Sequence, residues 1–225
     1  KYFKLAGFPD HVYTAILATS KQMEAVIRNP KIHGVSLTGS FNAGSSVAKI
    51  AGEEVKPSLL ELGGNDAYII LDDADLDLAV REGLASRMKN AGQSCIGAKR
   101  FVVTEQVYDS FKEKIHQAMK AIKFGDPMDL STDLGTVVNT EAAELFDKRV
   151  SMAEENGAKV LYHPGREGAL LPPIVIDHVN YKSELVLEET FGPIIPIIRV
   201  PDEDEEVIKI SNSTAFGLSS GVCTN

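Results

Sequence analysis

The 225-residue sequence predicts an α/β fold built on a parallel, doubly wound sheet. Short apolar runs with the character of strands alternate with segments whose apolar residues recur every three to four positions, as on a helix with one buried face. Turns that contain glycine separate the two kinds of segment. This alternation is typical of sheets whose parallel strands are joined by crossover helices.

The first part of the chain contains a possible anion-binding turn. Residues 34–38 are expected to form a strand and residues 45–51 a helix, and backbone N–H groups at the start of a helix can bind an anion. Gly39 and Gly44 in this turn are separated by four residues, which is not the usual dinucleotide fingerprint. On the residues alone, an ordinary strand-to-helix turn is the better interpretation. The other elements expected before residue 64 are the end of a helix at 1–6, a strand at 12–19, a helix at 21–28 and a strand at 58–62.

A second α/β unit is expected to start near Asn65, with a hinge at Gly63-Gly64, because the alternation starts again there. Acidic residues at 72–75 mark the start of a helix, where the N-cap and the helix dipole favour them. Gly92 suits the left-handed residue that closes this helix. The strands expected in this unit are 67–71, 100–104, 158–162, 174–176, 194–200 and 217–223, and the further helices are 106–124, 140–157 and 205–211.

Two chemically reactive residues flank, in the sequence, the helix that starts at residues 72–75 and closes at Gly92. Glu61 is surrounded by apolar residues at the end of a strand, and a buried carboxylate is costly unless it is paired or used. Cys95 follows the helix, and its small neighbours leave the sulfur accessible. We interpret Cys95 as the nucleophile and Glu61 as the general base of one active site. Taken singly, a lone cysteine is more often a small core residue and a glutamate before two glycines is more often a solvated charge.

The composition is that of an ordinary globular protein, with 44% hydrophobic and 24% charged residues. The formal net charge of −9 gives the chain no general attraction for the phosphates of nucleic acids. No apolar run reaches the length of a membrane span. Two cysteines cannot form a disulfide framework or a zinc cluster, and the five histidines have no metal-ligand spacing. We therefore expect a cytoplasmic protein without a metal, a membrane or a nucleic-acid partner.

Five blocks of sequence occur in a specific order: LTGSFNAG, ELGGN, DDADLDLAV, NAGQSC and EETFGPI. Together they resemble the aldehyde dehydrogenase superfamily over nearly the whole chain, and ELGG followed by GQxC at this distance is highly specific. Asn65 stands where many relatives carry lysine, so within the superfamily the chain is most similar to succinate-semialdehyde dehydrogenases. The resemblance implies the end of a Rossmann-type NAD(P)-binding domain at residues 1–63. It also implies an α/β catalytic domain at residues 64–225 that is truncated at its C-terminal end.

The resemblance further implies roles for single residues. The family has its cofactor pyrophosphate near the serine that matches Ser40, holds the nicotinamide ribose with the glutamate that matches Glu189, and packs an aromatic residue, here Phe191, near the nicotinamide. On the residues alone, the two acids at 188–189 fit a solvated charge and Phe191 fits a packed turn. The full set expected to bind NAD or NADP is Gly39, Ser40, Gly44, Leu62, Gly63, Glu189 and Phe191.

The implied reaction is covalent oxidation of an aldehyde, with succinate semialdehyde as the expected substrate. Cys95 would attack the aldehyde to give a thiohemiacetal, hydride transfer to NAD(P)+ would leave a thioester, and Glu61 would activate the water that hydrolyses it. The backbone N–H of Cys95 is one candidate donor to the oxyanion. The presence of Glu61 argues against the acyl-CoA-forming branch of the family, whose members usually lack this carboxylate.

Parts of the family's machinery are expected to lie outside these residues: the oxyanion-hole asparagine, the first half of the nucleotide-binding sheet and the C-terminal tail used in oligomerisation. We therefore expect the intact protein to be a homodimeric or homotetrameric enzyme, and this chain alone to turn over little or nothing. Two other classes stay open. One is a cysteine-dependent hydrolase or amidase that uses the same two residues without a redox step, and the other is a non-catalytic relative that serves as a structural or binding module.

Overall fold

The computed structural model describes all 225 residues, which form two compact units. Unit 1 is residues 1–62 and unit 2 is residues 63–225. Each unit has its own β-sheet, with two strands in unit 1 and six in unit 2.

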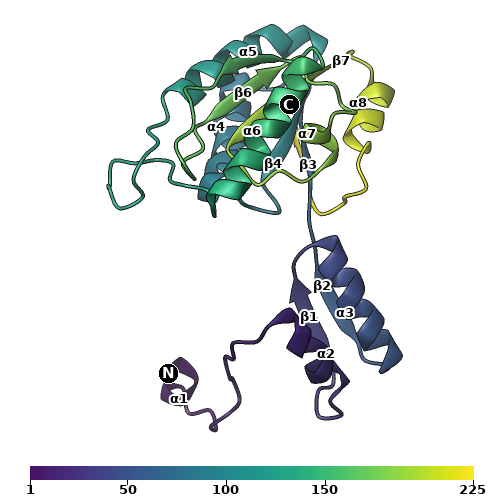
Figure 1. Ribbon diagram of the computed structural model, residues 1–225. Helices are drawn as coiled ribbons and strands as arrows, with labels where there is room; N and C mark the ends of the chain where they lie inside the picture. The colour runs from purple at the N-terminus through teal and green to yellow at the C-terminus, as the bar shows by residue number, and fades with distance from the viewer. The chain divides into compact units, whose positions relative to one another are not determined.

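Unit 1 is built on a β–α–β motif, in which a helix connects two parallel strands (Figure 1). An ion pair from Arg28 to Glu53 (2.6 Å) and another to Glu54 (3.0 Å) join the ends of the second and third helices. The elements in chain order are α1 (Tyr2–Leu5), α2 (Ser20–Arg28), β1 (Val35–Thr38), α3 (Phe41–Glu53) and β2 (Ser58–Glu61).

Two predictions for unit 1 differ from the structure. Residues 12–19 form no strand, because no backbone hydrogen bonds join them to a neighbouring strand. The helix predicted for 45–51 begins earlier, at Phe41, because Ser40 caps it by accepting a hydrogen bond at Oγ from the N–H of Ala43 (3.3 Å). Gly44 therefore lies in the first turn of α3 and not in the turn that precedes it.

Unit 2 is a six-stranded sheet in the order β5-β6-β7-β4-β3-β8, with helices on both faces (Figure 1). Neighbouring strands are parallel except for the antiparallel pair of β5 and β6. The elements in chain order are β3 (Asp66–Ile70), α4 (Leu76–Met88), the 3₁₀ turn η1 (Lys89–Gly92), β4 (Ala98–Thr104), α5 (Glu105–Lys120), α6 (Thr140–Glu155), β5 (Lys159–Tyr162), β6 (Ile174–Asp177), α7 (Glu184–Leu187), β7 (Ile194–Val200), α8 (Asp204–Ser211) and β8 (Gly221–Cys223).

The central strands of unit 2 are covered on both faces. All residues of β4 and β6 are buried, as expected for parallel strands between two layers of helices. One buried apolar cluster includes Phe111 and Ile115 of α5, and a second cluster includes Phe146 and Val150 of α6. Adjacent β4 residues alternate between the two clusters, so the sheet separates two cores. This arrangement is the predicted α/β architecture.

Two predicted elements of unit 2 are shorter in the structure. Helix α5 ends at Lys120 and not at residue 124, because Phe124 leaves the helix and forms an isolated β-bridge with Leu134. The final strand was expected at 217–223, but only Gly221–Cys223 pairs with β3. Ser219 in the missing part donates its backbone N–H to the carboxylate of Asp66 (3.1 Å) and so belongs to a loop.

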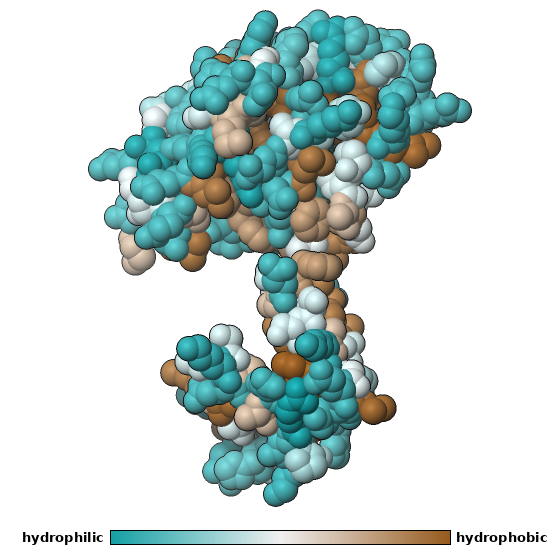
Figure 2. Space-filling model, turned by 45° about the vertical axis from the view of Figure 1, so that its right-hand side comes forward, coloured by the Kyte–Doolittle hydropathy of each residue, from teal (hydrophilic) through white to brown (hydrophobic).

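The surface of unit 2 is mostly hydrophilic in the view of Figure 2, with apolar residues scattered between the polar ones. None of the helices combines the length and the apolar character that a membrane crossing requires. No three His, Cys, Asp or Glu side chains are grouped so that they could hold a metal ion.

Candidate functional site

The chain leaves α4 through three successive residues in the left-handed region. The φ angle is 53° at Asn90, 55° at Ala91 and 75° at Gly92. Gly92 was predicted to be left-handed, whereas nothing in the sequence indicated that the two residues before it would be. Such backbone strain is costly for residues with a side chain and is often found at functional sites. It directs the chain into residues 93–97, the Cys95 loop.

Gly92 packs directly against the segment of residues 188–193, the EETFGP loop. A Cβ atom added to Gly92 would lie 2.1 Å from the carbonyl oxygen of Gly192. Since no real Cβ approaches a backbone oxygen so closely, only glycine fits at position 92. The strained turn before the Cys95 loop and the EETFGP loop therefore meet backbone to backbone, although they are far apart in the sequence.

Lys99 at the start of β4 holds the Cys95 loop in place. Its side chain is 1% exposed, and its ammonium group donates to the carbonyl oxygens of Ser94 and Cys95, each at 2.7 Å. The same nitrogen lies 3.6 Å from Oε1 of Glu189 and 5.5 Å from the ring centre of Phe191. One buried cation thus contacts the backbone of the thiol-bearing residue and two candidate residues of the EETFGP loop.

Gly63 and Gly64 also lie against both loops. The N–H of Gly64 donates to Oε1 of Glu189 at 3.0 Å. A Cβ on Gly63 would lie 2.5 Å from Oε2 of Glu189, and a Cβ on Gly64 would lie 2.5 Å from the carbonyl oxygen of Cys95. Glycine is therefore needed at position 64, where the contact is with backbone, whereas at position 63 a Cβ would displace the carboxylate of Glu189. The predicted site residues that unit 2 brings together are Gly63, Cys95, Glu189 and Phe191.

Three buried or half-buried side chains hold the backbone of the EETFGP loop and its flanks. Arg87 of α4 is 1% exposed, and its Nε and Nη2 donate to carbonyl oxygens at 2.7 and 3.0 Å. The amide of Asn65 and the guanidinium group of Arg149 donate to further carbonyl oxygens. The accepting residues are Val186, Glu188, Glu189, Thr190 and Ile194.

Two of the buried groups are cations that share one nearby acid. Burial lowers the pKa of Lys99 below its usual range, neighbouring Arg87 lowers it further, and Glu189 opposes both effects. Burial also lowers the pKa of Arg87, again against the influence of Glu189. One guanidinium nitrogen of Arg87, Nη1, has no hydrogen-bond partner. Because buried charges need a counter-charge, Glu189 is the acid that offsets this pair of cations.

The other predicted residues gather at one end of unit 1. The N–H of Gly39 donates to the carbonyl oxygen of Glu61 at 3.0 Å, and Ser40 is the N-cap of α3. A Cβ on Gly44 would lie 2.5 Å from Cδ2 of Leu62, so the side chain of Leu62 packs on the first turn of α3. Phe41 and Asn42, the first two residues of α3, are exposed, and their backbone N–H groups have no intrahelical acceptors, which makes this end suitable for an anion.

Glu61 is exposed in unit 1, and the prediction of a buried carboxylate is wrong. Strand β2 has a single neighbour, β1, and three of its four residues are exposed. Apolar neighbours along a strand indicate burial only when another layer covers that strand. Any chemical role of Glu61 therefore depends on its position and not on desolvation within unit 1.

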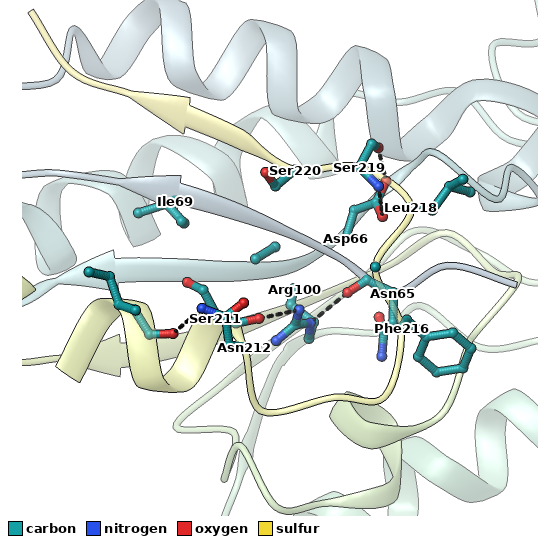
Figure 3. Close-up of a pocket in the computed structure, with 13 residues that line it drawn as sticks. Asn65, Asp66, Ile69, Arg100, Ser211, Asn212, Phe216, Leu218, Ser219 and Ser220 are labelled. Atoms are coloured by element: carbon teal, nitrogen blue, oxygen red, sulfur yellow. Dashed lines mark hydrogen bonds between the residues drawn. The ribbon is translucent and has the colours of Figure 1, made fainter. Parts of the chain in front are cut away.

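A cavity of about 390 Å³ lies at the start of β3 in unit 2, beside α8 and the loop that follows it (Figure 3). Arg100 on its wall donates to the carbonyl oxygens of Asn65 (2.7 Å) and Ser211 (2.8 Å). The guanidinium group of Arg100 thus donates to protein acceptors, and neither Cys95 nor Glu61 lines the cavity. We therefore assign this cavity no part in the candidate site.

The sequence reasoning missed the side chains that support the site. Apolar residues and glycine recur at helical spacing in α4 and indicate its core face, and this periodicity does not reveal that Arg87 is also fully buried there. Lys99 could have been identified from the sequence, because a lysine in a buried strand must find hydrogen-bond acceptors for its ammonium group. Arg149 of α6 is polar within a periodic helix and gave no such signal.

Known proteins match the whole chain. A family model described as "Aldehyde dehydrogenase family" matches residues 1–225. The succinate-semialdehyde dehydrogenase (NADP+) of Mycobacterium avium strain 104 is 42% identical over an alignment length of 225, and the alignment covers 97% of this chain and 47% of that protein. The corresponding enzyme 1 of Mycobacterium tuberculosis H37Rv is 41% identical over 221 residues, covering 97% and 48%. The chain thus spans about half the length of the curated relatives it matches.

Solved structures match equally well. An NADP-dependent enzyme of E. coli superposes with a TM-score of 0.94 at 34% identity, covering 99% of this chain and 47% of that chain. The succinic semialdehyde dehydrogenase of Streptococcus pyogenes, solved in complex with NADP+, gives 0.92 at 35% identity, covering 99% and 49%. These matches confirm the predicted α/β fold and its resemblance to this family.

Proposed function

The chain belongs to the aldehyde dehydrogenase family, and from this premise we propose that the intact protein oxidises an aldehyde to the corresponding acid with NADP+ or NAD+. The observation that carries the proposal is the cluster around Lys99. There the backbone of Cys95, the Gly63-Gly64 pair and the carboxylate of Glu189 contact one another within unit 2. One buried cation therefore holds the backbone of the thiol-bearing residue and the proposed ribose-binding carboxylate, and covalent hydride transfer requires these two groups to be positioned together.

In the proposed reaction, Cys95 is the nucleophile. Its thiolate forms a bond to the aldehyde carbon, and the carbonyl electron pair moves to the oxygen. When that pair returns, the hydrogen on the same carbon would leave as hydride to the acceptor that a bound nicotinamide would supply, and a thioester would remain on the sulfur of Cys95. The backbone N–H of Cys95 donates to no protein acceptor, so it is free to stabilise the oxyanion.

Glu61 is the proposed general base of the second half-reaction. It stands two residues before Gly63, so covalent connectivity alone keeps their Cα atoms within about 7.6 Å of each other. Glu61 takes a proton from water as the water attacks the thioester, which releases the acid and restores the thiolate of Cys95.

The residues present fit the chemistry of a nicotinamide cofactor, which supplies the hydride acceptor when bound. The exposed N–H groups at the start of α3, beside Ser40, suit a pyrophosphate. The carboxylate of Glu189 is half-buried and can accept hydrogen bonds from ribose hydroxyls, while the ring of Phe191 can exclude water from the reacting face. The names of the curated relatives favour NADP.

Substrate, assembly and location are part of the same proposal. Succinate semialdehyde is the proposed substrate, because the similar curated enzymes are named for it. We propose a homodimer or homotetramer from the resemblance to the family. We propose a cytoplasmic location because both cysteines are free thiols, which persist in reducing compartments.

The test measures reduced-nicotinamide absorbance with the full-length protein, succinate semialdehyde and each cofactor. Cys95→Ser is expected to lower turnover by at least about a thousandfold, because the nucleophile is lost. Cys223→Ser is the matched control, since that sulfur contacts the hydroxyl of Tyr68 away from the proposed site. Its turnover is expected to stay at the parent level.

A second variant separates the two half-reactions. Glu61→Gln is expected to allow one equivalent of reduced nicotinamide per active site and then to slow steady turnover by roughly 10²–10⁴-fold, because hydrolysis of the thioester stalls. Unchanged turnover in Cys95→Ser would refute the proposal. Cleavage of esters or amides by Cys95 without nicotinamide reduction would assign the protein to the hydrolases instead.

A further inference from the structure

Lys99 occupies a position where a cation is costly. It lies in β4, all of whose residues are buried, and its side chain is 1% exposed. Taking an ammonium group out of water costs several kcal/mol unless acceptors and a counter-charge compensate. In the structure these are the carbonyl oxygens of Ser94 and Cys95 and the carboxylate of Glu189.

The groups that Lys99 contacts belong to the two segments that the proposed chemistry must hold at a fixed distance, the Cys95 loop and the EETFGP loop. The carbonyl of Cys95 belongs to the same residue as the reactive sulfur, which is joined to it through Cα and Cβ. Glu189 is the proposed ribose ligand of the EETFGP loop. The ammonium group therefore joins the backbone of Cys95 to the carboxylate of the proposed cofactor ligand through a single side chain.

On the basis of the proposed function, we propose that Lys99 is a positioning residue for Cys95: its ammonium group holds the Cys95 loop to Glu189, and its positive charge favours the thiolate form of Cys95. A cation close to a cysteine makes the thiolate easier to form, and the thiolate is the species that attacks. The role of Lys99 is thus exerted through the residues it holds, without contact with the substrate.

The charges around Lys99 determine how strong this effect is. Arg87 of α4 adds a second positive charge, whereas Glu189 of the EETFGP loop and Asp66 of β3 are negative. Glu189 is the nearest acid and offsets part of the charge. Removing Lys99 and removing Glu189 are therefore expected to shift the ionisation of Cys95 in opposite directions.

The test follows alkylation of Cys95 by iodoacetamide as a function of pH, in the full-length protein with Cys223→Ser and any other cysteine replaced. Lys99→Met removes the charge and the donors, and Lys99→Gln removes the charge but keeps an NH₂ group that can donate to two carbonyls. Lys148→Met removes an exposed charge of the same sign from α6 and is the matched control. The midpoint of each pH profile is compared, because the plateau rate also changes with thiol basicity.

We expect Lys99→Met and Lys99→Gln to raise the midpoint by about one pH unit, which corresponds to roughly a tenfold smaller thiolate fraction at neutral pH. Lys148→Met is expected to keep the parent midpoint, and Glu189→Gln to lower it. If Lys99→Met does not fold, Lys99→Gln carries the test. A midpoint unchanged in Lys99→Gln, or a midpoint raised by Glu189→Gln, would overturn the proposal.

The same variants separate this proposal from the proposed function. Alkylation reports on the thiol whether or not the protein reduces nicotinamide. If the parent protein forms no reduced nicotinamide but Lys99→Gln still raises the midpoint, the dehydrogenase assignment fails and the role of Lys99 stands. If the parent turns over normally and Lys99→Gln leaves the midpoint unchanged, only the role of Lys99 fails.

Discussion

Substitution of Gly92 by alanine tests the packing of the strained turn against the EETFGP loop. The left-handed φ of 75° costs an alanine about 1–2 kcal/mol. The added Cβ would also lie 2.1 Å from the carbonyl oxygen of Gly192, and moving packed backbone costs a further 1–3 kcal/mol or so. We therefore expect Gly92→Ala to lower the free energy of unfolding by about 2–5 kcal/mol.

Gly157→Ala is the matched control, because it shares the conformation and lacks the contact. Gly157 follows α6 with a φ of 97°, and an added Cβ would have no atom within 4 Å. Only the conformational cost applies there, about 1–2 kcal/mol. Each substitution also stabilises the protein by lowering the conformational entropy of the unfolded chain. This contribution is the same in both variants and cancels when their free energies of unfolding are subtracted. The expected difference between them, about 1–3 kcal/mol, is therefore the cost of the contact alone.

The assay is guanidinium denaturation of both variants, monitored by far-UV circular dichroism. The free energies of unfolding are compared when the variants have the same m-value, the slope of that free energy against denaturant concentration. Alkylation of Cys95 gives a local readout, since displacement of Gly92 moves the Cys95 loop and is expected to change the labelling rate in Gly92→Ala only. Equal losses of stability in the two variants, with equal labelling rates, would refute the inferred backbone contact.

Three further predictions concern unit 2. Arg87→Met should lower the free energy of unfolding by about 2–4 kcal/mol, because it leaves two buried carbonyls unpaired. Arg81→Met on the exposed face of the same helix should stay within about 0.5 kcal/mol in the same denaturation assay, and equal effects would contradict the buried role. Burial raises the pKa of Tyr68, so its stabilising contribution is complete below about pH 10 and is lost as the pH rises above that value. Between pH 9 and 11 the parent should lose about 1 kcal/mol more than Tyr68→Phe in denaturant melts, and parallel curves would exclude this effect. Asp75→Ala should cost about 1 kcal/mol by removing the N-cap of α4, and an unchanged melting curve would show that the cap contributes nothing.

The fold could be predicted because its signals are local. The periodicity of α6 and the apolar run of β7 give the element types directly, and both match the structure closely. Errors occurred where distant partners decide the outcome. Residues 12–19 have strand-like composition without a neighbouring strand, and Phe124 leaves a helical pattern because it pairs with Leu134.

The sequence indicated four candidate residues that the structure brings together in unit 2, but it did not indicate the side chains that support them. The structure places Gly63, Cys95, Glu189 and Phe191 together, and their catalytic and cofactor roles remain predictions. The buried cation Lys99 and the strained turn that ends at Gly92 depend on contacts between loops, which no pattern in a single sequence encodes. The exposure of Glu61 depends likewise on what covers β2, and apolar neighbours gave no information about that.

The anchoring of the EETFGP loop has a consequence for how the protein can change. Arg87, Asn65 and Arg149 bind the loop and its flanks mainly at peptide oxygens, which every amino acid provides. Substitutions at the exposed positions 187 and 188 would leave these bonds intact. New side chains can therefore appear beside Glu189 during evolution while the hydrogen bonds that position this loop stay the same.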